Sequence, residues 1–221
     1  MSEKRKVIKG TSPRGSVMWF KCIKPDDKFK KFTIDLIVDD TPEIRKIIDS
    51  MDTLIDETLK EEKAKAVEKG DHKRKAKLGL SKNKSIEEQL DSQGQPTGKF
   101  VKKFRLASSG KKKDDTVYQI APPALFNSQA KPYSESEKAS LQVFNGSIAQ
   151  VSFEISPYAL ATGDVGASLK PKAIMLHKIQ QVAMDASQYG FSASELQQDS
   201  EFAMENSEVQ VEESTASNDD F

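Results

Sequence analysis

The chain has 221 residues, of which 34 are Lys or Arg, 34 are Asp or Glu and 36% are hydrophobic. This composition predicts one soluble domain with polar additions and excludes a chain that is disordered throughout. The sequence has no apolar run near the ~20 residues of a membrane helix and no hydrophobic signal core after its charged first nine residues, so we expect a cytoplasmic protein without membrane contact. One cysteine, Cys22, and two histidines, His72 and His177, exclude an internal disulfide and argue against a zinc site.

Two regions of opposite charge add up to the net charge of zero. All 34 bases lie in residues 1–178 beside 24 of the acids, a net of +10, whereas the last 43 residues hold ten acids and no base. A basic body favours a polyanionic ligand, and like charges without apolar partners cannot form a core. We therefore expect residues 183–221 to be a disordered acidic interaction tail. The alternative is a tail that only improves solubility.

The first predicted elements are two strands and a helix. Residues 17–23 form an apolar and aromatic run that ends in a Lys-Pro-Asp-Asp turn, and residues 32–38 alternate with the two-residue period of a half-buried strand. These two runs could pair as a hairpin. Thr41-Pro42-Glu43 then has the composition of a helix start, and apolar residues follow at three- and four-residue steps as far as Leu59. The last turns before Gly70 are expected to be solvated and frayed.

The second half of the body is predicted to be mostly β. Residues 70–99 are polar and basic at their start, and we expect a mobile basic insertion there. Strand patterns follow at residues 100–107, 116–120, 147–156 and 173–179, with a basic turn at 108–115 and a loop at 157–166. Strands thus outnumber helices over residues 1–182. A small antiparallel barrel closed by one amphipathic helix fits this order best.

Motifs of common enzymes are missing from the sequence. It contains no phosphate-binding loop, nucleophile elbow or His-x-x-x-His pair. Asp35, Asp39 and Asp40 could hold magnesium in a nuclease, although the last two directly precede the predicted helix start. We interpret His177 as a core or rim residue and Cys22 as a small buried hydrophobe. The sequence therefore predicts a protein that is not an enzyme and has no cofactor.

Aromatic and basic residues are interleaved in three segments, at residues 19–21, 29–32 and 100–105. Binding of single-stranded nucleic acid requires both, because cations neutralise phosphates while ring faces stack on unpaired bases. Aromatic residues in short strands also occur as core residues, so each ring can be a stacking platform or part of the core.

Several short motifs, in this order, resemble the bacteriophage T-seven type single-stranded DNA-binding protein family. They are Lys24-Pro25-Asp26, Ile34-Asp35-Leu36, the helix after it, Ser156-Pro157-Tyr158, Val165-Gly166-Ala167-Ser168-Leu169-Lys170 and the final Asp219-Asp220-Phe221. The resemblance covers most of the chain, but residues 71–99 depart from the pattern of the family.

The resemblance implies an oligonucleotide/oligosaccharide-binding (OB) barrel with a long capping helix. It also implies a role in phage DNA replication, recombination and repair in the host cytoplasm, by coating and annealing single strands without strong sequence preference. Trp19, Tyr158 and Lys170 match positions of the family and are candidate DNA contacts. Charge adds further candidates, namely Lys21, Lys103, Arg105, Lys111, Lys112, Lys113 and Lys172.

The implied partners are the replicative DNA polymerase and the helicase-primase, which the acidic tail would recruit. The tail residues with this predicted role are Glu212, Glu213, Asp219, Asp220 and Phe221. The tail can also occupy the basic groove in cis or from the partner in a homodimer. Two other classes remain open at this point: a protein-interaction adaptor without DNA affinity, and a magnesium-dependent nuclease.

Overall fold

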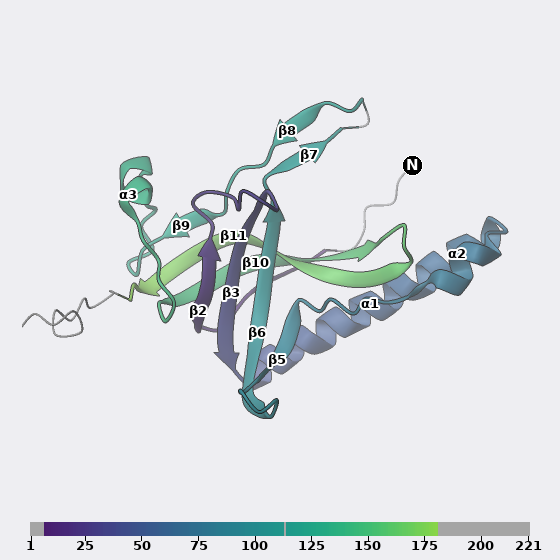
Figure 1. Ribbon diagram of the computed structural model, residues 1–221, viewed down its shortest axis with the longest axis horizontal. Coiled ribbons are helices and arrows are strands. Elements are labelled where there is room, and N and C mark those ends of the chain that lie inside the picture. The colour runs from purple at the N-terminus through teal and green to yellow at the C-terminus, as the bar shows by residue number, and fades with distance from the viewer. Residues whose placement is uncertain (1–6, 113, 181–221) are drawn as a thin grey trace, which may run out of the picture. The chain divides into compact units, whose positions relative to one another are not determined.

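The computed structural model describes residues 7–112 and 114–180 (Figure 1). In chain order, its first elements are β1 Ile8–Thr11, β2 Gly15–Lys21, β3 Lys31–Asp39, α1 Pro42–Glu68, α2 His72–Lys77, β4 Gly79–Leu80 and β5 Ile86–Leu90. The remaining elements are β6 Pro96–Ala107, β7 Ser109–Lys111, β8 Val117–Gln119, β9 Ala124–Phe126, α3 Glu135–Ser140, β10 Ile148–Ala159 and β11 Asp164–Lys178.

Five strands form an OB-like barrel in the order β10, β2, β3, β6, β11, and β11 pairs again with β10. The β2–β3, β3–β6 and β10–β11 ladders are antiparallel. The two other junctions are thin: β10 meets β2 only at Ile148 and Ala149, and β11 meets β6 through one parallel pair, Leu169 with Phe104. The expected closed antiparallel barrel is therefore wrong in two respects, because the ladder is not closed continuously and one junction is parallel.

Alternating side chains fill the barrel. Phe32, Ile34, Leu36 and Val38 of β3 are buried, as are the alternate residues of β10 from Ala149 to Ile155. This confirms the two-residue periods that the sequence showed in both strands. Ile44, Met51 and Leu54 of α1 join the same core, so the helix packs against the barrel through its apolar stripe.

Helix α1 begins where the sequence predicts. The Thr41 hydroxyl accepts a hydrogen bond from the Ile44 amide at 3.4 Å, and Pro42 occupies the first turn. The expected fraying after Leu59 is wrong, because Glu62 and Ala66 are buried. Ala66, Leu78 and Val165 form a second, smaller apolar cluster that holds the last turns of α1.

Residues 70–99, expected to be a mobile insertion, are built into the sheet. They form α2, β4, β5 and the start of β6. The Ser81 amide donates to the Val165 carbonyl, the Lys103 amide to the Ser85 carbonyl, and the Ser85 hydroxyl to the Ala167 carbonyl, each at 2.8 Å. The segment thus lies between β6 and β11, where the barrel ladder is thinnest.

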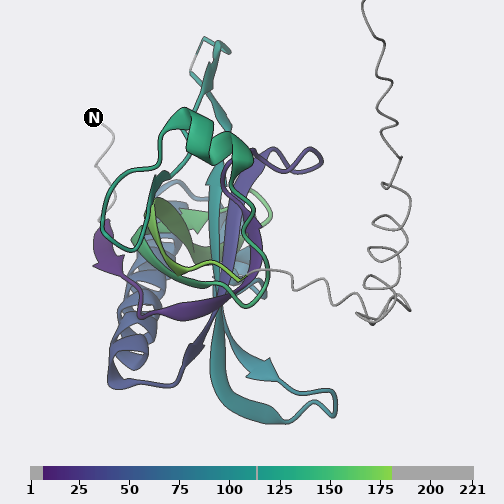
Figure 2. The same ribbon diagram turned by 90° about the vertical axis from the view of Figure 1, so that its left-hand side faces the viewer.

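Several other elements differ from the sequence expectations. The strand at Val117–Gln119 pairs with β7 and not with β6, so the two form a separate small hairpin. β11 begins at Asp164, within the predicted loop. The sequence did not reveal this start, because Gly166 and Ser168 obscure the alternation of the buried residues. β1 and α3 were not predicted. Seen at 90° to the first view, the β7–β8 hairpin and the turn between β5 and β6 lie at opposite ends of the barrel (Figure 2).

One charged side chain lies inside the barrel. Lys102 on β6 is 0% exposed, and its ammonium lies 4.7 Å from the ring centre of Phe153 and 5.5 Å from that of Phe104. Within the described chain, its Nζ has no hydrogen-bond partner. Burial lowers the pKa of Lys102 from 10.5 to about 7.

No helix in the described ranges has both the length and the apolar character needed to span a bilayer.

We expect Lys102→Met to stabilise the protein in a pH-dependent manner. The folded-state pKa of Lys102 lies below its unfolded value, so the unfolded chain binds more protons between about pH 7 and 10.5. The unfolding free energy of the unmodified protein should therefore rise with pH across this window, by up to about 1.4 kcal/mol per pH unit. The advantage of the Met variant should be full at pH 7 and below, and should shrink towards pH 10.

Denaturant unfolding of both proteins at several pH values measures this effect. The difference between the two proteins cancels the titration of Cys22, whose buried thiol has a raised pKa and acts in the opposite direction above about pH 9. A difference that does not change with pH would show that Lys102 is not the titrating group.

Candidate nucleic-acid interface

The outer surface of β2, β3 and β6 brings together four of the predicted DNA contacts. Strand register aligns Trp19 with Asp35 and Lys103 in one row, and Lys21 with Thr33 and Arg105 in the next. Ile34 and Phe104, which alternate with these residues, point into the core. We call the surface formed by Trp19, Lys21, Thr33, Asp35, Lys103 and Arg105 the outer sheet face. Because Leu169 pairs with Phe104, Lys170 lies beside Arg105 at the edge of this face.

Carboxylates already neutralise several of the predicted cations. Both Asp35 oxygens accept hydrogen bonds from Arg105, with Nη2 and Oδ2 3.0 Å apart, and the Asp35 side chain is only 11% exposed. Lys103 pairs with Glu87, and Lys172 pairs with Glu154 at 2.9 Å. Charge alone therefore overstates what these three residues offer to a phosphate. Their carboxylate partners lie far away in the sequence, so no local pattern reveals them.

Three predicted cations are free of such partners. Over the described residues, no ion pair involves Lys21, Lys112 or Lys170. Lys111 approaches Asp115 at 3.9 Å, but both side chains are largely exposed, and a pair of this kind contributes little. Lys113 lies outside the described residues. Lys21, Lys112 and Lys170 are thus the best placed of the predicted residues for contact with a phosphate.

Two aromatic rings are exposed on β2 and in the turn that follows it. Trp19 is 46% exposed on β2, and Phe29, in the β2–β3 turn, is 63% exposed. Asp26 shapes this turn, since its Oδ1 accepts hydrogen bonds from the amides of Lys28 at 3.0 Å and Phe29 at 2.8 Å. The ammonium of Lys28 lies 5.3 Å from the ring centre of Phe29. An exposed ring held beside a cation can stack on a base while the cation contacts the backbone.

Phe29 lies in one of the three interleaved segments, at residues 29–32, but it was not among the candidate DNA contacts selected from the sequence. Its two signals were the Lys-Pro-Asp-Asp turn and the basic run around it, and both place it at the tip of a hairpin and not in a strand. The family resemblance selected Trp19, in the strand, and the sequence left open whether the ring of Phe29 is a stacking platform or part of the core.

The β7–β8 hairpin rises at the same end of the barrel as the β2–β3 turn (Figure 1). The amide and the hydroxyl of Ser108 both donate to the Lys30 carbonyl, at 2.9 and 2.8 Å, and so join the two loops. The hairpin carries Lys111 and Lys112, together with the half-exposed ring of Tyr118. Aromatic and basic groups thus extend beyond the outer sheet face at this end.

Tyr158 lies apart from this cluster. It is near the end of β10 that is opposite to the junction with β2, and its ring lies over Gly166. A Cβ at residue 166 would be 2.6 Å from the Tyr158 hydroxyl oxygen, so a larger residue there would displace the ring. The hydroxyl is 3.1 Å from Ser81 Oγ. Tyr158 therefore holds the β4 segment against β11, whatever contact it makes with DNA.

The other residues weighed for chemistry lie in separate environments. The Cys22 thiol is fully buried and donates to the Thr33 carbonyl at 3.2 Å, which confirms its prediction as a buried hydrophobe. His177 is half-buried beside Gln150, and burial lowers its pKa. Asp39 pairs with Lys99 at 3.5 Å, and Asp40 pairs with Arg45, whereas Asp35 pairs with Arg105. In the described ranges, no three His, Cys, Asp or Glu residues converge in a way that could hold a metal ion.

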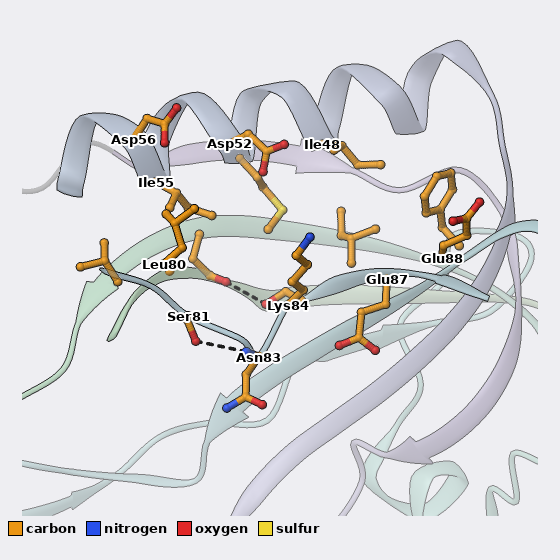
Figure 3. A pocket seen from close by; sticks show the side chains of 17 residues that line it. Ile48, Asp52, Ile55, Asp56, Leu80, Ser81, Asn83, Lys84, Glu87 and Glu88 are labelled. Carbon is orange, nitrogen blue, oxygen red and sulfur yellow. Dashed lines mark hydrogen bonds between the residues drawn. The ribbon is translucent and has the colours of Figure 1, made fainter. Parts of the chain in front are cut away.

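A cleft of about 710 Å³ lies between α1 and the segment from Leu80 to Glu88 (Figure 3). Its lining mixes apolar side chains with four carboxylates, Asp52, Asp56, Glu87 and Glu88, and Lys84 faces α1. These carboxylates would repel phosphates, so the cleft is not suited to nucleic acid.

The predicted tail contacts Glu212, Glu213, Asp219, Asp220 and Phe221 lie outside the described residues.

Solved structures with a similar fold are phage single-stranded DNA-binding proteins. The crystal structure of gp2.5, a single-stranded DNA binding protein encoded by bacteriophage T7, has a TM-score of 0.60 and 17% identity, over 97% of this chain and 100% of that chain. The single-stranded DNA-binding protein from bacteriophage Enc34, in complex with single-stranded DNA, has a TM-score of 0.50 and 16% identity, over 78% of this chain and 88% of that chain.

A C-terminally truncated form of the Enc34 protein has a TM-score of 0.51 and 16% identity, over 77% of this chain and 86% of that chain. No family model matches the sequence, and no curated protein is similar to it at a significant level. These findings confirm, for the fold, the resemblance inferred from the sequence motifs.

We expect the main effect of Arg105→Gln to be a lower unfolding free energy and not a direct loss of DNA contact. The substitution leaves the Asp35 carboxylate, only 11% exposed, without its counter-charge, which should lower the unfolding free energy by about 1 to 3 kcal/mol. The double variant Asp35→Asn with Arg105→Gln removes both charges and should recover most of this loss. Denaturant unfolding of the three proteins measures it. As a control, Lys103→Gln should cost under about 1 kcal/mol, since Glu87 is 41% exposed. Equal losses in the single and double variants would contradict a structural role for the pair.

Proposed function

We propose that this chain is a non-enzymatic single-stranded DNA-binding protein. The observation that carries the proposal is the placement of the exposed Trp19 and Phe29 rings beside lysines on an OB-like barrel. OB folds bind oligonucleotides on the face of their second and third strands and on the loop between their first and second strands. In this chain these are β3, β6 and the β2–β3 turn. The fold shared with phage proteins of this class, one of them solved with single-stranded DNA, supports the same interpretation.

Stacking is the feature that would distinguish a single strand from a duplex. Unpaired bases expose their ring faces, so Trp19 and Phe29 can stack on them, whereas paired bases are already stacked on each other. Every base has such a face, so little sequence preference follows. Lys21, Lys112 and Lys170 would add phosphate contacts, and the affinity should fall with salt by about 0.7 in log units per log unit of salt for each phosphate neutralised.

The proposed biological role is coating and annealing of single strands in phage DNA replication, recombination and repair, in the cytoplasm of the host. The acidic tail would recruit the replicative DNA polymerase and the helicase-primase, with Phe221 filling an apolar pocket on a partner. The tail could also occupy the DNA-binding surface in cis or across a homodimer. Support for these roles comes from the charge asymmetry of the sequence and from the resemblance to the phage family.

Binding and cleavage assays with single-stranded DNA distinguish the adaptor and nuclease alternatives. An adaptor would show no affinity for single strands, and a nuclease would cleave them when magnesium is added. A nuclease also needs carboxylates that bind the same metal ion, whereas Asp35, Asp39 and Asp40 each pair with a different Lys or Arg side chain. We therefore expect stoichiometric binding of single-stranded DNA and no cleavage.

We expect Trp19→Ala and Phe29→Ala each to weaken binding of a short single-stranded oligonucleotide by roughly 1 to 3 kcal/mol. Trp19 is about half exposed and Phe29 mostly exposed, so the thermal midpoint should change little. Fluorescence anisotropy titrations at fixed salt, with a thermal melt of each variant, make the measurement. Leu90→Ala is the matched control, because Leu90 is 55% exposed at the opposite end of the barrel. Unchanged affinity in both ring variants would remove the basis of the proposal.

We expect removal of residues 192–221 to increase the affinity for DNA at low salt. The truncation deletes nine acids and no base, so the net charge rises from 0 to +9. Screening should reduce the gain as salt increases. Deletion of Phe221 alone is the control, because it removes no acidic side chain and should leave DNA affinity unchanged. A truncated protein that binds more weakly than the full chain would show that the tail does not compete with DNA.

A further inference from the structure

A second concentration of unpaired positive charge in the described structure lies away from the outer sheet face. Residues 69–84, which we call the basic arm, contain seven Lys or Arg and one Asp, a net charge of +6. In the described part of the chain, Arg74 pairs with Glu62 at 3.2 Å, and no ion pair involves the six lysines of the arm. In Figure 1, α2 lies at the far end of α1, away from the β2–β3 turn, whereas Lys84, near the other end of the arm, faces α1 (Figure 3).

The arm is held firmly, although α2 itself buries none of its residues. Leu78 joins Ala66 and Val165 in the second apolar cluster, and the Asp71 amide donates to the Ala66 carbonyl at 2.8 Å. Gly163, in the turn between β10 and β11, has φ +105, and a Cβ there would lie 2.4 Å from the Lys77 carbonyl oxygen. Such close approach fixes the arm against the barrel, so its lysines are displayed from a defined position.

Solubility alone does not explain this composition. Helix α1 is also exposed along one side, and it mixes five bases with eight acids, as is usual for a solvated helix. The arm instead presents one sign of charge along consecutive residues. A concentrated positive surface attracts polyanions and binds them in a salt-dependent manner.

The chemistry of the arm differs from that of the outer sheet face in one respect. Residues 69–84 contain no Phe, Tyr or Trp, so the arm has no large ring that could stack on an unpaired base. Its contacts would be made with phosphates only, and these are present in paired and unpaired strands alike. Duplex DNA has the higher charge density along its axis and therefore suits a surface of this kind.

We propose that the basic arm is a second nucleic-acid site, which binds the phosphate backbone of duplex DNA while the outer sheet face holds a single strand. The inference rests on the proposed function for its context, but the arm can be tested separately. Such a protein would bridge a coated single strand to a neighbouring duplex. Its duplex affinity would be weaker than its single-strand affinity and steeper in its response to salt.

The test uses the full chain and the variant Lys73→Gln/Lys75→Gln/Lys77→Gln. These three side chains are exposed and lie on a helix that buries nothing, so the thermal midpoint should not change. The matched control is Lys46→Gln/Lys131→Gln/Lys178→Gln, which removes the same charge from exposed positions scattered over other elements. Trp19→Ala reports on the outer sheet face.

Each protein is titrated with a blunt-ended duplex and with a short single strand over a range of salt concentrations. We expect the duplex affinity of the arm variant to fall at least tenfold at low salt, with its salt slope reduced by about 0.9 for each phosphate that the variant no longer neutralises. Its single-strand affinity should stay within twofold of that of the control. Trp19→Ala should show the opposite pattern.

A capture experiment tests simultaneous binding. Protein bound to an immobilised short single strand is exposed to labelled duplex, and only proteins with an intact arm should retain the label. Duplex affinity equal to that of the scattered control, or equal losses on duplex and single strand, would overturn the proposal. If Trp19→Ala leaves single-strand binding intact while the arm variant loses duplex affinity, the outer sheet face is wrongly assigned and the arm is not.

Discussion

The arrangement of the molecule depends on how the seam between β6 and β11 is filled. The two strands share one residue pair, Leu169 with Phe104, so most backbone groups along the seam need other partners. Ser85 supplies two of them, through its carbonyl to the Lys103 amide and its hydroxyl to the Ala167 carbonyl. Once this segment is part of the sheet, the chain between it and α1 must pass the end of β11, and that path determines where the basic arm lies.

Strand β6 shows how strictly the barrel separates its two sides. Phe100 and Phe104 are buried, and the outward Lys103 and Arg105 are matched by carboxylates from neighbouring strands. Lys102 is the exception, because it belongs to the inward series and its ammonium lies close to the rings of Phe104 and Phe153. A buried amine without a hydrogen-bond partner is costly when charged, so its proton is held more weakly than that of an exposed lysine.

Local pattern in the sequence predicted the elements whose partners are nearby. The alternation in β3 and β10, the Thr41 cap and the apolar stripe of α1 each depend on neighbouring residues, and the structure has them as expected. The elements that differ depend on distant contacts. Residues 79–90 contain few apolar residues and form strands because β6 and β11 offer unpaired backbone groups. Equally, no local signal could show that Asp35 neutralises Arg105, which lies 70 residues away.

In the functions proposed here, the two surfaces would differ in what they recognise, because their chemistry differs. The arm holds a net +6 of the +10 carried by residues 1–178, which leaves only +4 for the rest of that region. On the outer sheet face, Asp35 and Glu87 cancel Arg105 and Lys103 locally. Under the proposed function, net charge alone would not supply the single-strand affinity of this region, and stacking by Trp19 and by Phe29 in the adjoining turn would provide a large part of it. Stacking selects unpaired bases, whereas the arm attracts any phosphate backbone, so a chain with a net charge of zero can keep a selective and an unselective surface at separate ends of one barrel.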